Sequence, residues 1–356
     1  MKERIGYYDI ARGLGIIFVV IGHIDTFYMP FRSVVITFHM ALFFMISGML
    51  FWENHTEERG YLESAKKKFI RIMVPYILFS ILSILIEFVR LALQEVFYWP
   101  HFKALIVSVG SFYGNSVMWF LPALFVSEML FLAIRKMKSD FVTIVSVLCL
   151  IVFAVWANTL NPGGSEFQQS LYAAMIRGIF CTVFVCAGYY IRKWIVPLKI
   201  SGYVYAAAAV VLLGICVKIN NINPKVDLRA MYWGEYIFAT DSSVKLLSVR
   251  VIMYLAGALA GALGVICLCR MLDRFGNSPL YKALAFFGSN SLIIMATHLD
   301  FHVLHYSMDL AAVLNQLVPG SAWYHAWILV FVFAAEAVLI KVINKYVPVL
   351  AGKYKK

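Results

Sequence analysis

Three ionisable residues lie in or just before the first apolar segment of the chain: Asp9, Arg12 and His23, within "YYDIARGLGIIFVVIGHID". Ionisable side chains cost free energy inside a bilayer, so those that occur there are commonly paired or functional. On an α-helix with about 100° per residue, the three would project from roughly one face, with Arg12 and His23 about 16 Å apart along the axis. The spacing therefore predicts a polar stripe along the first helix.

The residue types on this stripe suggest a site with two ends. A guanidinium at one end can hold a phosphorylated group, and a neutral imidazole deeper along the face can act as a general base. An elongated donor such as acyl-CoA, with phosphates at one end and a thioester at the other, would reach both.

Two structural alternatives stay open. Asp9 and Arg12 are three residues apart and can form a helix-end ion pair, and a single histidine in a span can bond to a neighbouring carbonyl.

The composition excludes a soluble globular protein. Of the 356 residues, 62% are hydrophobic and 14% are charged, against about 45–50% and about 25% in soluble domains. The apolar residues form long blocks, which predicts an all-α integral membrane protein. The net charge of +12 comes from short basic clusters between these blocks, so membrane lipid is an expected partner and nucleic acid is not.

The apolar blocks predict a polytopic bundle of about ten transmembrane helices, each of roughly spanning length. They lie near residues 10–29, 34–52, 72–94, 117–134, 141–158, 172–191, 203–219, 244–268, 286–306 and 323–346. The basic connectors, such as "RKMKSD" and "RKWIVPLK", fall on the same side as the N-terminus, so both termini are expected in the cytoplasm. The opposite connector, 219–243, is either an amphipathic cap or part of a binding surface.

Five stretches form an ordered pattern along the chain. They are "YYDIARGLGIIFVVIGHI" with Arg12 and His23, "FHMALFFMISGMLF" with His39 and Ser47, "KKKFIRIMVPYILF" with Arg71 and Tyr76, "MWFLPALFVSEMLF" with Trp119 and Glu128, and "FFGSNSLIIMATH" with Asn290 and His298. Together they resemble the acyltransferase 3 family of integral-membrane O-acyltransferases, and most closely its stand-alone sugar O-acetylases of the fucose 4-O-acetylase type. The resemblance covers nearly the whole chain.

The resemblance implies a role for each of these residues. His23 would be the general base or a transient acyl carrier, with Asp9 and Glu128 beside it in the catalytic set. Glu128 would orient His23 or the acceptor, or else pair structurally with a residue such as Arg177. Arg12 and Arg71 would bind the donor. The acceptor side would include His39, Ser47, Tyr76, Trp119, Asn290 and His298, and Ser47 and Tyr76 are also candidate oxyanion donors.

The expected function is transfer of an acetyl or other acyl group from cytoplasmic acetyl-CoA to a hydroxyl of a cell-surface polysaccharide or its lipid-linked sugar precursor. The enzyme would lie in the plasma membrane, the bacterial inner membrane, as a single transmembrane acyltransferase domain over residues 1–356. No fused extracytoplasmic esterase-like domain is expected. The acyl group would therefore pass directly to the acceptor or to a separate extracytoplasmic partner protein.

One alternative function uses the same buried polar residues. A glycan-lipid or small-anion transporter or flippase could use them as a substrate path, although the sequence shows no internal repeat of the kind common in transporters. If His298, His302 and His305 lie on one helix, they would share a face, with Asp309 in line, at a spacing that zinc could use. An acceptor groove is the preferred interpretation of these histidines, and no metal is expected. Glu87 and Arg90 are expected to form a structural ion pair.

Overall fold

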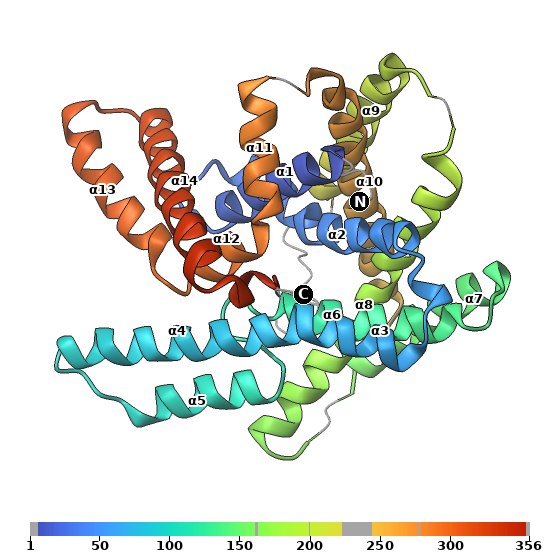
Figure 1. Ribbon diagram of the computed structural model, residues 1–356, viewed down its shortest axis with the longest axis horizontal. Helices are drawn as coiled ribbons and strands as arrows, with labels where there is room; N and C mark the ends of the chain where they lie inside the picture. The colour runs from blue at the N-terminus through green and yellow to red at the C-terminus, as the bar shows by residue number, and fades with distance from the viewer. Residues whose placement is uncertain (1–5, 161–162, 199, 223–243, 277, 354–356) are drawn as a thin grey trace. The chain divides into compact units, whose positions relative to one another are not determined.

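The computed structural model describes residues 6–160, 163–198, 200–222, 244–276 and 278–353, and every regular element within them is helical (Figure 1). The expected all-α fold is therefore confirmed for these residues. The long helices are α1 (Gly6–Gly22), α2 (Met29–Glu53), α4 (Val74–Leu93), α6 (Phe120–Arg135), α7 (Asp140–Asn158), α8 (Glu166–Tyr190), α9 (Gly202–Ile222), α10 (Val244–Leu272) and α14 (Ser321–Tyr346). Most of the 219–243 connector lies outside the described residues.

Shorter elements connect or extend these helices. They are α3 (Tyr61–Lys68), α5 (Trp99–Gly110), α11 (Pro279–Ser289), α12 (Ser291–Thr297), α13 (Val303–Leu317), and the single turns η1 (Thr56–Glu58), η2 (Phe69–Met73), η3 (Ile191–Ile195), η5 (Asp273–Phe275) and η6 (Pro348–Ala351). The turn η2 has π-helical geometry and joins α3 to α4, so the chain is helical from Tyr61 to Leu93.

The chain packs as two compact units that interleave along the sequence. Unit 1 consists of Met1–Ser64, Val126–Asn161 and Met175–Ser289. Unit 2 consists of Ala65–Phe125, Pro162–Ala174 and Asn290–Lys356. Unit 1 thus holds α1, α2, α7, α9, α10 and α11, and unit 2 holds α4, α5, α12, α13 and α14. The expectation of a single transmembrane domain stays a prediction.

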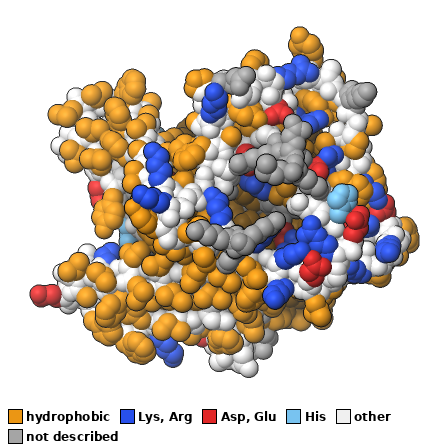
Figure 2. Space-filling view, viewed as in Figure 1, with side chains coloured by type: hydrophobic (Ala, Val, Ile, Leu, Met, Phe, Trp, Pro, Cys, Tyr) orange, Lys and Arg blue, Asp and Glu red, His pale blue; other side chains and the backbone are white. Residues whose placement is uncertain are grey.

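Within the described residues, seven helices are long and apolar enough to cross a membrane, or eight if the bent pair α11 and α12 forms one span. The helices α1 and α6 coincide with two further expected segments but have only 17 and 16 residues. Apolar side chains cover much of the visible surface (Figure 2). The exposed large apolar residues include Ile81, Leu85 and Val210. Such exposure is typical of helices that meet lipid. The number of ten spans and the cytoplasmic termini stay predictions.

The expected continuous helix over 286–306 is wrong. The helix α11 ends at Ser289, and α12 follows at an angle of 65° after a single residue, Asn290. A second break separates α12 from α13, and His302 adopts a left-handed conformation there, with φ of 58°. Asparagine is unfavourable in helix interiors, in keeping with the first break at Asn290. Because of the second break, His298, His302 and His305 do not share one helical face.

Two pairs of helices in unit 1 approach closely at glycines. A Cβ atom on Gly288 of α11 would lie 1.7 Å from the Asp9 carbonyl oxygen of α1, and one on Gly13 would lie 2.2 Å from the Leu284 carbonyl oxygen. The helices α2 and α8 cross similarly, because a Cβ on Gly48 would lie 1.9 Å from the Val185 carbonyl oxygen. Small residues at such crossings allow helices to pack backbone to backbone inside a membrane.

We expect the substitution Gly288→Ala to destabilise the contact between α1 and α11. Its methyl group would meet backbone atoms, which cannot rotate away, so the free energy of unfolding should fall by about 1–3 kcal/mol. The matched control is Gly214→Ala in α9, where an added Cβ meets nothing within 4 Å. Thermal unfolding in detergent should show a lower Tm for the first variant and an equal or higher Tm for the second. Equal Tm values for the two variants would contradict this account.

Candidate functional site

The N-terminal end of α1 carries an ion pair. An Arg12 guanidinium nitrogen lies 3.6 Å from the Asp9 carboxylate, and the side chains are 27% and 8% exposed. The structure therefore contains the helix-end pair that their spacing allows. The Arg270 guanidinium of α10 lies 4.8 Å above the Tyr7 ring, so a second cation lies at this end of α1. Arg12 remains partly accessible while Asp9 is buried behind it.

His23 lies just beyond the other end of α1. The helix ends at Gly22, and the His23 N–H donates to the Val20 carbonyl in the closing turn, at 3.0 Å. The Gly22 carbonyl accepts a hydrogen bond of 2.8 Å from Arg32 Nε of α2, and Arg32 also pairs with Asp25 at 2.7 Å. His23 thus lies in the closing turn of α1 and is half-buried. Its place on one face with Asp9 and Arg12 stays a prediction.

Two predicted site residues from different helices meet inside unit 1. The Ser47 hydroxyl of α2 donates a hydrogen bond to the Glu128 carboxylate of α6, and Glu128 is 4% exposed. A buried carboxylate needs such a donor because burial without one is costly. The Ser47 proton is directed to Glu128, so a role for Ser47 as oxyanion donor would require this bond to break. The expected orientation of His23 by Glu128 stays a prediction.

His39 also lies in α2. Its Nδ1 is 2.9 Å from the Val35 carbonyl oxygen one turn earlier, and the residue is buried. This contact leaves Nε2 as the ring nitrogen that points away from the backbone of its own helix. The expected contact of His39 with the acceptor stays a prediction.

The other predicted site residues belong to unit 2. Arg71 is exposed in the π-helical turn η2. The Tyr76 hydroxyl donates to the Val109 carbonyl at 2.8 Å, which gives it a structural partner. Trp119 is buried immediately before α6, and fully buried His298 contacts the Ile294 carbonyl oxygen through Nδ1 at 2.8 Å. The fifth residue, Asn290, occupies the break between α11 and α12.

The expected ion pair between Glu87 and Arg90 is confirmed. The guanidinium donates to both carboxylate oxygens at 2.7 and 2.8 Å. His101 and His302 also lie 3.3 Å from this carboxylate. Glu87 therefore connects α4 with α5 and with the turn before α13.

A buried carboxylate in α14 was not among the predicted site residues. Glu336 is fully buried, and both of its carboxylate oxygens lie within 2.9 Å of the Thr297 hydroxyl at the end of α12. The signal in the sequence is a single acidic residue inside the last apolar segment, "VFVFAAEAVLIKV". Its partner Thr297 directly precedes the predicted residue His298 in the sequence.

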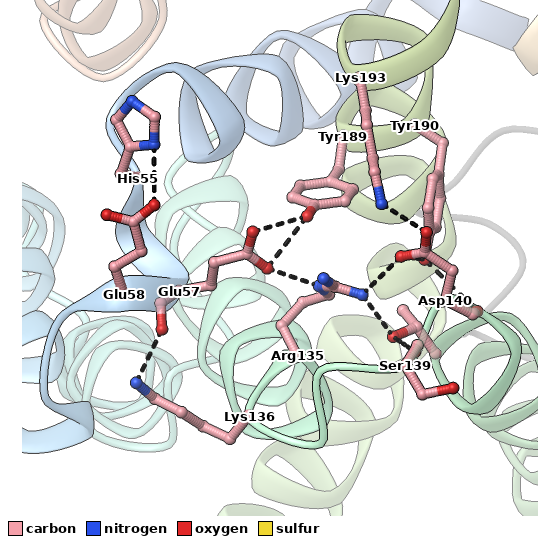
Figure 3. Close-up of polar contacts among 11 residues, drawn as sticks. His55, Glu57, Glu58, Arg135, Lys136, Ser139, Asp140, Tyr189, Tyr190 and Lys193 are labelled. Carbon is pink, nitrogen blue, oxygen red and sulfur yellow. Dashed lines mark hydrogen bonds and ion pairs between the residues drawn. The ribbon is translucent and has the colours of Figure 1, made fainter.

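A network of charged residues at one end of unit 1 was also not predicted from the sequence (Figure 3). Arg135, at the end of α6, donates to Glu57 at 2.7 Å and to Asp140 at 2.9 Å. The Tyr189 hydroxyl of α8 donates to the same Glu57 at 2.8 Å, and Lys193 pairs with Asp140. In the sequence, the connectors that contain these residues were interpreted only as basic segments that set the topology. In the structure, Glu57 and Asp140 bind the ends of α6, α7 and α8 together.

The model of the acyltransferase 3 family, described as an acyltransferase domain, matches residues 5–343. The chain belongs to this family. A search of curated proteins and a search of solved structures found no match. The family resemblance of the five sequence stretches is thereby confirmed. Membership in the acyltransferase 3 family, together with the apolar helices, indicates a membrane acyltransferase.

The charge network predicts different effects for two neighbouring glutamates. Glu57→Gln removes a charged partner from Arg135, whose side chain is 6% exposed, and should lower the free energy of unfolding by about 2–3 kcal/mol. Glu58→Gln changes a pair with His55 in which both side chains are more than half exposed, and should cost less than about 0.5 kcal/mol. Thermal unfolding of the two variants measures the difference. A Tm for Glu57→Gln at the level of Glu58→Gln would show that the network does not stabilise unit 1.

Proposed function

We propose that this acyltransferase transfers an acetyl group from cytoplasmic acetyl-CoA to a hydroxyl of a cell-surface polysaccharide or its lipid-linked sugar precursor. The observation that carries the proposal is the layout of α1, which has an ion-paired, partly exposed arginine at one end and a histidine just after the other. The helical rise separates the two residues by about 16 Å. An extended thioester donor matches this separation.

The donor phosphates would bind at the N-terminal end of α1. Arginine presents a planar set of N–H donors that suits phosphate oxygens and keeps its charge at all physiological pH values. Asp9 is buried and pairs with Arg12, so it limits the orientations of the guanidinium. Arg71 is exposed in unit 2 and is the proposed second phosphate contact.

The chemistry would take place at His23. The acceptor hydroxyl oxygen attacks the thioester carbonyl carbon while its proton passes to the imidazole. The tetrahedral intermediate then expels the coenzyme A thiolate, which takes the proton back from the imidazolium. The products are an O-acetyl ester and free coenzyme A. In the variant of this scheme with His23 as acyl carrier, the imidazole nitrogen attacks the thioester carbonyl carbon and expels the coenzyme A thiolate, which takes up the imidazole proton. The acceptor hydroxyl then attacks the acyl-imidazole, which gives the O-acetyl ester and returns the hydroxyl proton to the released imidazole.

The proposed location is the plasma membrane of a bacterium, with both termini in the cytoplasm. This orientation places Arg12 at the cytoplasmic side, where acetyl-CoA is available, and His23 toward the outer side. The proposed acceptor and catalytic surroundings are half-buried Ser47 and the buried residues His39 and Glu128 of unit 1, and the buried residues Tyr76, Trp119, Asn290 and His298 of unit 2. The alternative recipient of the acyl group is a separate extracytoplasmic protein.

Binding of the donor should stabilise the folded protein. At about 100 times its Kd, acetyl-CoA adds roughly 2.7 kcal/mol to the free energy of unfolding if it binds only the folded state. We expect the Tm of the detergent-purified protein to rise with acetyl-CoA, and the rise to be much smaller for Arg12→Ala. The matched control is Arg59→Ala, an exposed arginine in the connector before α3, which should keep the full rise. If acetyl-CoA causes no rise in the wild type, it is not the donor.

Substitution of His23 should show whether this residue acts in acetyl-CoA binding or in the acyl-transfer step. His23→Gln should keep the acetyl-CoA-dependent rise in Tm but lose about 100-fold or more in turnover, since a general base contributes about 10²–10⁴-fold. Turnover is measured as thiol release from acetyl-CoA in membrane vesicles of the expressing cells, which supply the acceptor. His55→Gln, at an exposed histidine, should behave like the wild type. Turnover of His23→Gln within a few-fold of the wild type would exclude His23 from both proposed roles.

A further inference from the structure

The chain folds back on itself after α14. The turn η6 (Pro348–Ala351) is followed by Gly352 in the left-handed conformation, with φ of 65°. The Lys353 N–H then donates to the Pro348 carbonyl at 3.0 Å and closes the segment. A Cβ on Gly352 would lie 3.0 Å from the Arg71 carbonyl oxygen, so this segment packs directly against η2 within unit 2. The C-terminal segment Pro348–Lys353 therefore lies beside a proposed donor contact.

The Lys353 side chain links this segment to the break between α11 and α12. Its ammonium donates to Asn344 Oδ1 at 2.7 Å and to Asn290 Oδ1 at 3.3 Å. Asn344, in the last turn of α14, donates from Nδ2 to the same Asn290 oxygen at 2.9 Å. The three side chains thus form a closed polar triangle.

The triangle explains an unusual feature of Asn290. An asparagine at a helix N-cap normally accepts a hydrogen bond from an N–H of the first turn of its own helix. Asn290 is the N-cap residue of α12, but its side chain makes no such bond. Its oxygen accepts from Lys353 and Asn344 instead. The Asn290 side chain therefore bonds to Lys353, 63 residues away in the sequence, and not to the first turn of α12. This contact attaches the helix break to the C-terminal segment.

The surrounding sequence is basic. The stretches 65–76 and 340–353 contain no Asp or Glu, and their seven basic residues are Lys66, Lys67, Lys68, Arg71, Lys341, Lys345 and Lys353. A high density of one charge sign attracts ligands of the opposite sign. These two stretches of unit 2 therefore suit a polyanion.

We propose that the C-terminal segment Pro348–Lys353 is part of the site for the phosphates of the donor. Lys353 acts there as a positioning residue, which holds Asn290 at the helix break and adds an ammonium to the end of unit 2 where Arg71 lies. The ligand chemistry is a polyphosphate, and the proposal rests on the proposed acetyl-CoA-dependent function. Anionic lipid head groups offer the same chemistry from another source.

The test uses the full-length protein and three variants. Lys353→Met removes the charge and both hydrogen bonds, Lys353→Arg keeps the charge, and Lys103→Met removes an exposed lysine of α5 that lies outside both basic stretches. Two quantities are measured for each: the KM and kcat for acetyl-CoA in membrane vesicles of the expressing cells, which supply the acceptor, and the rise in Tm caused by adenosine 3′,5′-bisphosphate in nanodiscs. We expect the KM of Lys353→Met to rise about tenfold with kcat nearly unchanged, and its Tm rise to shrink. Lys103→Met should match the wild type, and Lys353→Arg should recover most of the affinity.

The outcomes separate this inference from the proposed function. If the wild type neither turns over acetyl-CoA nor responds to the bisphosphate, both are overturned. If the wild type responds and Lys353→Met responds equally, only the inference is overturned. A fall in kcat and in unliganded Tm without a change in KM would make Lys353 a purely structural residue. Repeating the measurement in neutral phosphatidylcholine and in anionic phosphatidylglycerol nanodiscs identifies the source: an effect that appears only with the anionic lipid would assign the segment to lipid head groups and overturn the donor assignment.

Discussion

The close approach of helix backbones at glycines is the constraint on which unit 1 depends. Lipid is as apolar as the helix surfaces, so helices in a membrane associate mainly through tight packing rather than through burial from water. Gly13 and Gly288 bring α1 against α11, and Gly48 brings α2 against α8. The first crossing lies at Asp9, which pairs with Arg12, and the second adjoins Ser47. The backbone contacts therefore fix the helices that carry the ionisable side chains.

Buried carboxylates in the protein are satisfied in a recurrent way. Glu128 accepts a hydrogen bond from Ser47 on another helix, and Glu336 accepts one from Thr297. A hydroxyl donor lowers the free-energy cost of burying a carboxylate. Arg135 and Glu57 form an ion pair at the end of α6, where the Glu57 side chain is 23% exposed. Partial exposure to solvent reduces the cost of desolvating such a pair.

Several residues expected to be functional lie where helices end or break. His23 follows the last residue of α1, and Asn290 separates α11 from α12. Backbone groups at such points lose their helical partners and need others, and here Arg32 bonds the Gly22 carbonyl. A side chain at a break can also point in a direction that the regular geometry of a helix does not allow. Irregular backbone inside a membrane is tolerated where protein surrounds it or where it lines a cavity, which suits a binding site.

The sequence by itself determined the membrane class, the helical content, the family and the local pairs. Hydropathy blocks, the Arg12–His23 motif and the three-residue spacing of Asp9 and Arg12 or of Glu87 and Arg90 are properties of short stretches. Only the tertiary structure decided the partners of the buried polar residues. Ser47 and Glu128 are 81 residues apart, and Glu57 and Arg135 are 78. Helices that are apolar on all sides carry little periodic signal to show which face meets which neighbour, so such pairs, and the helix breaks at Asn290 and His302, depend on contacts that no local pattern contains.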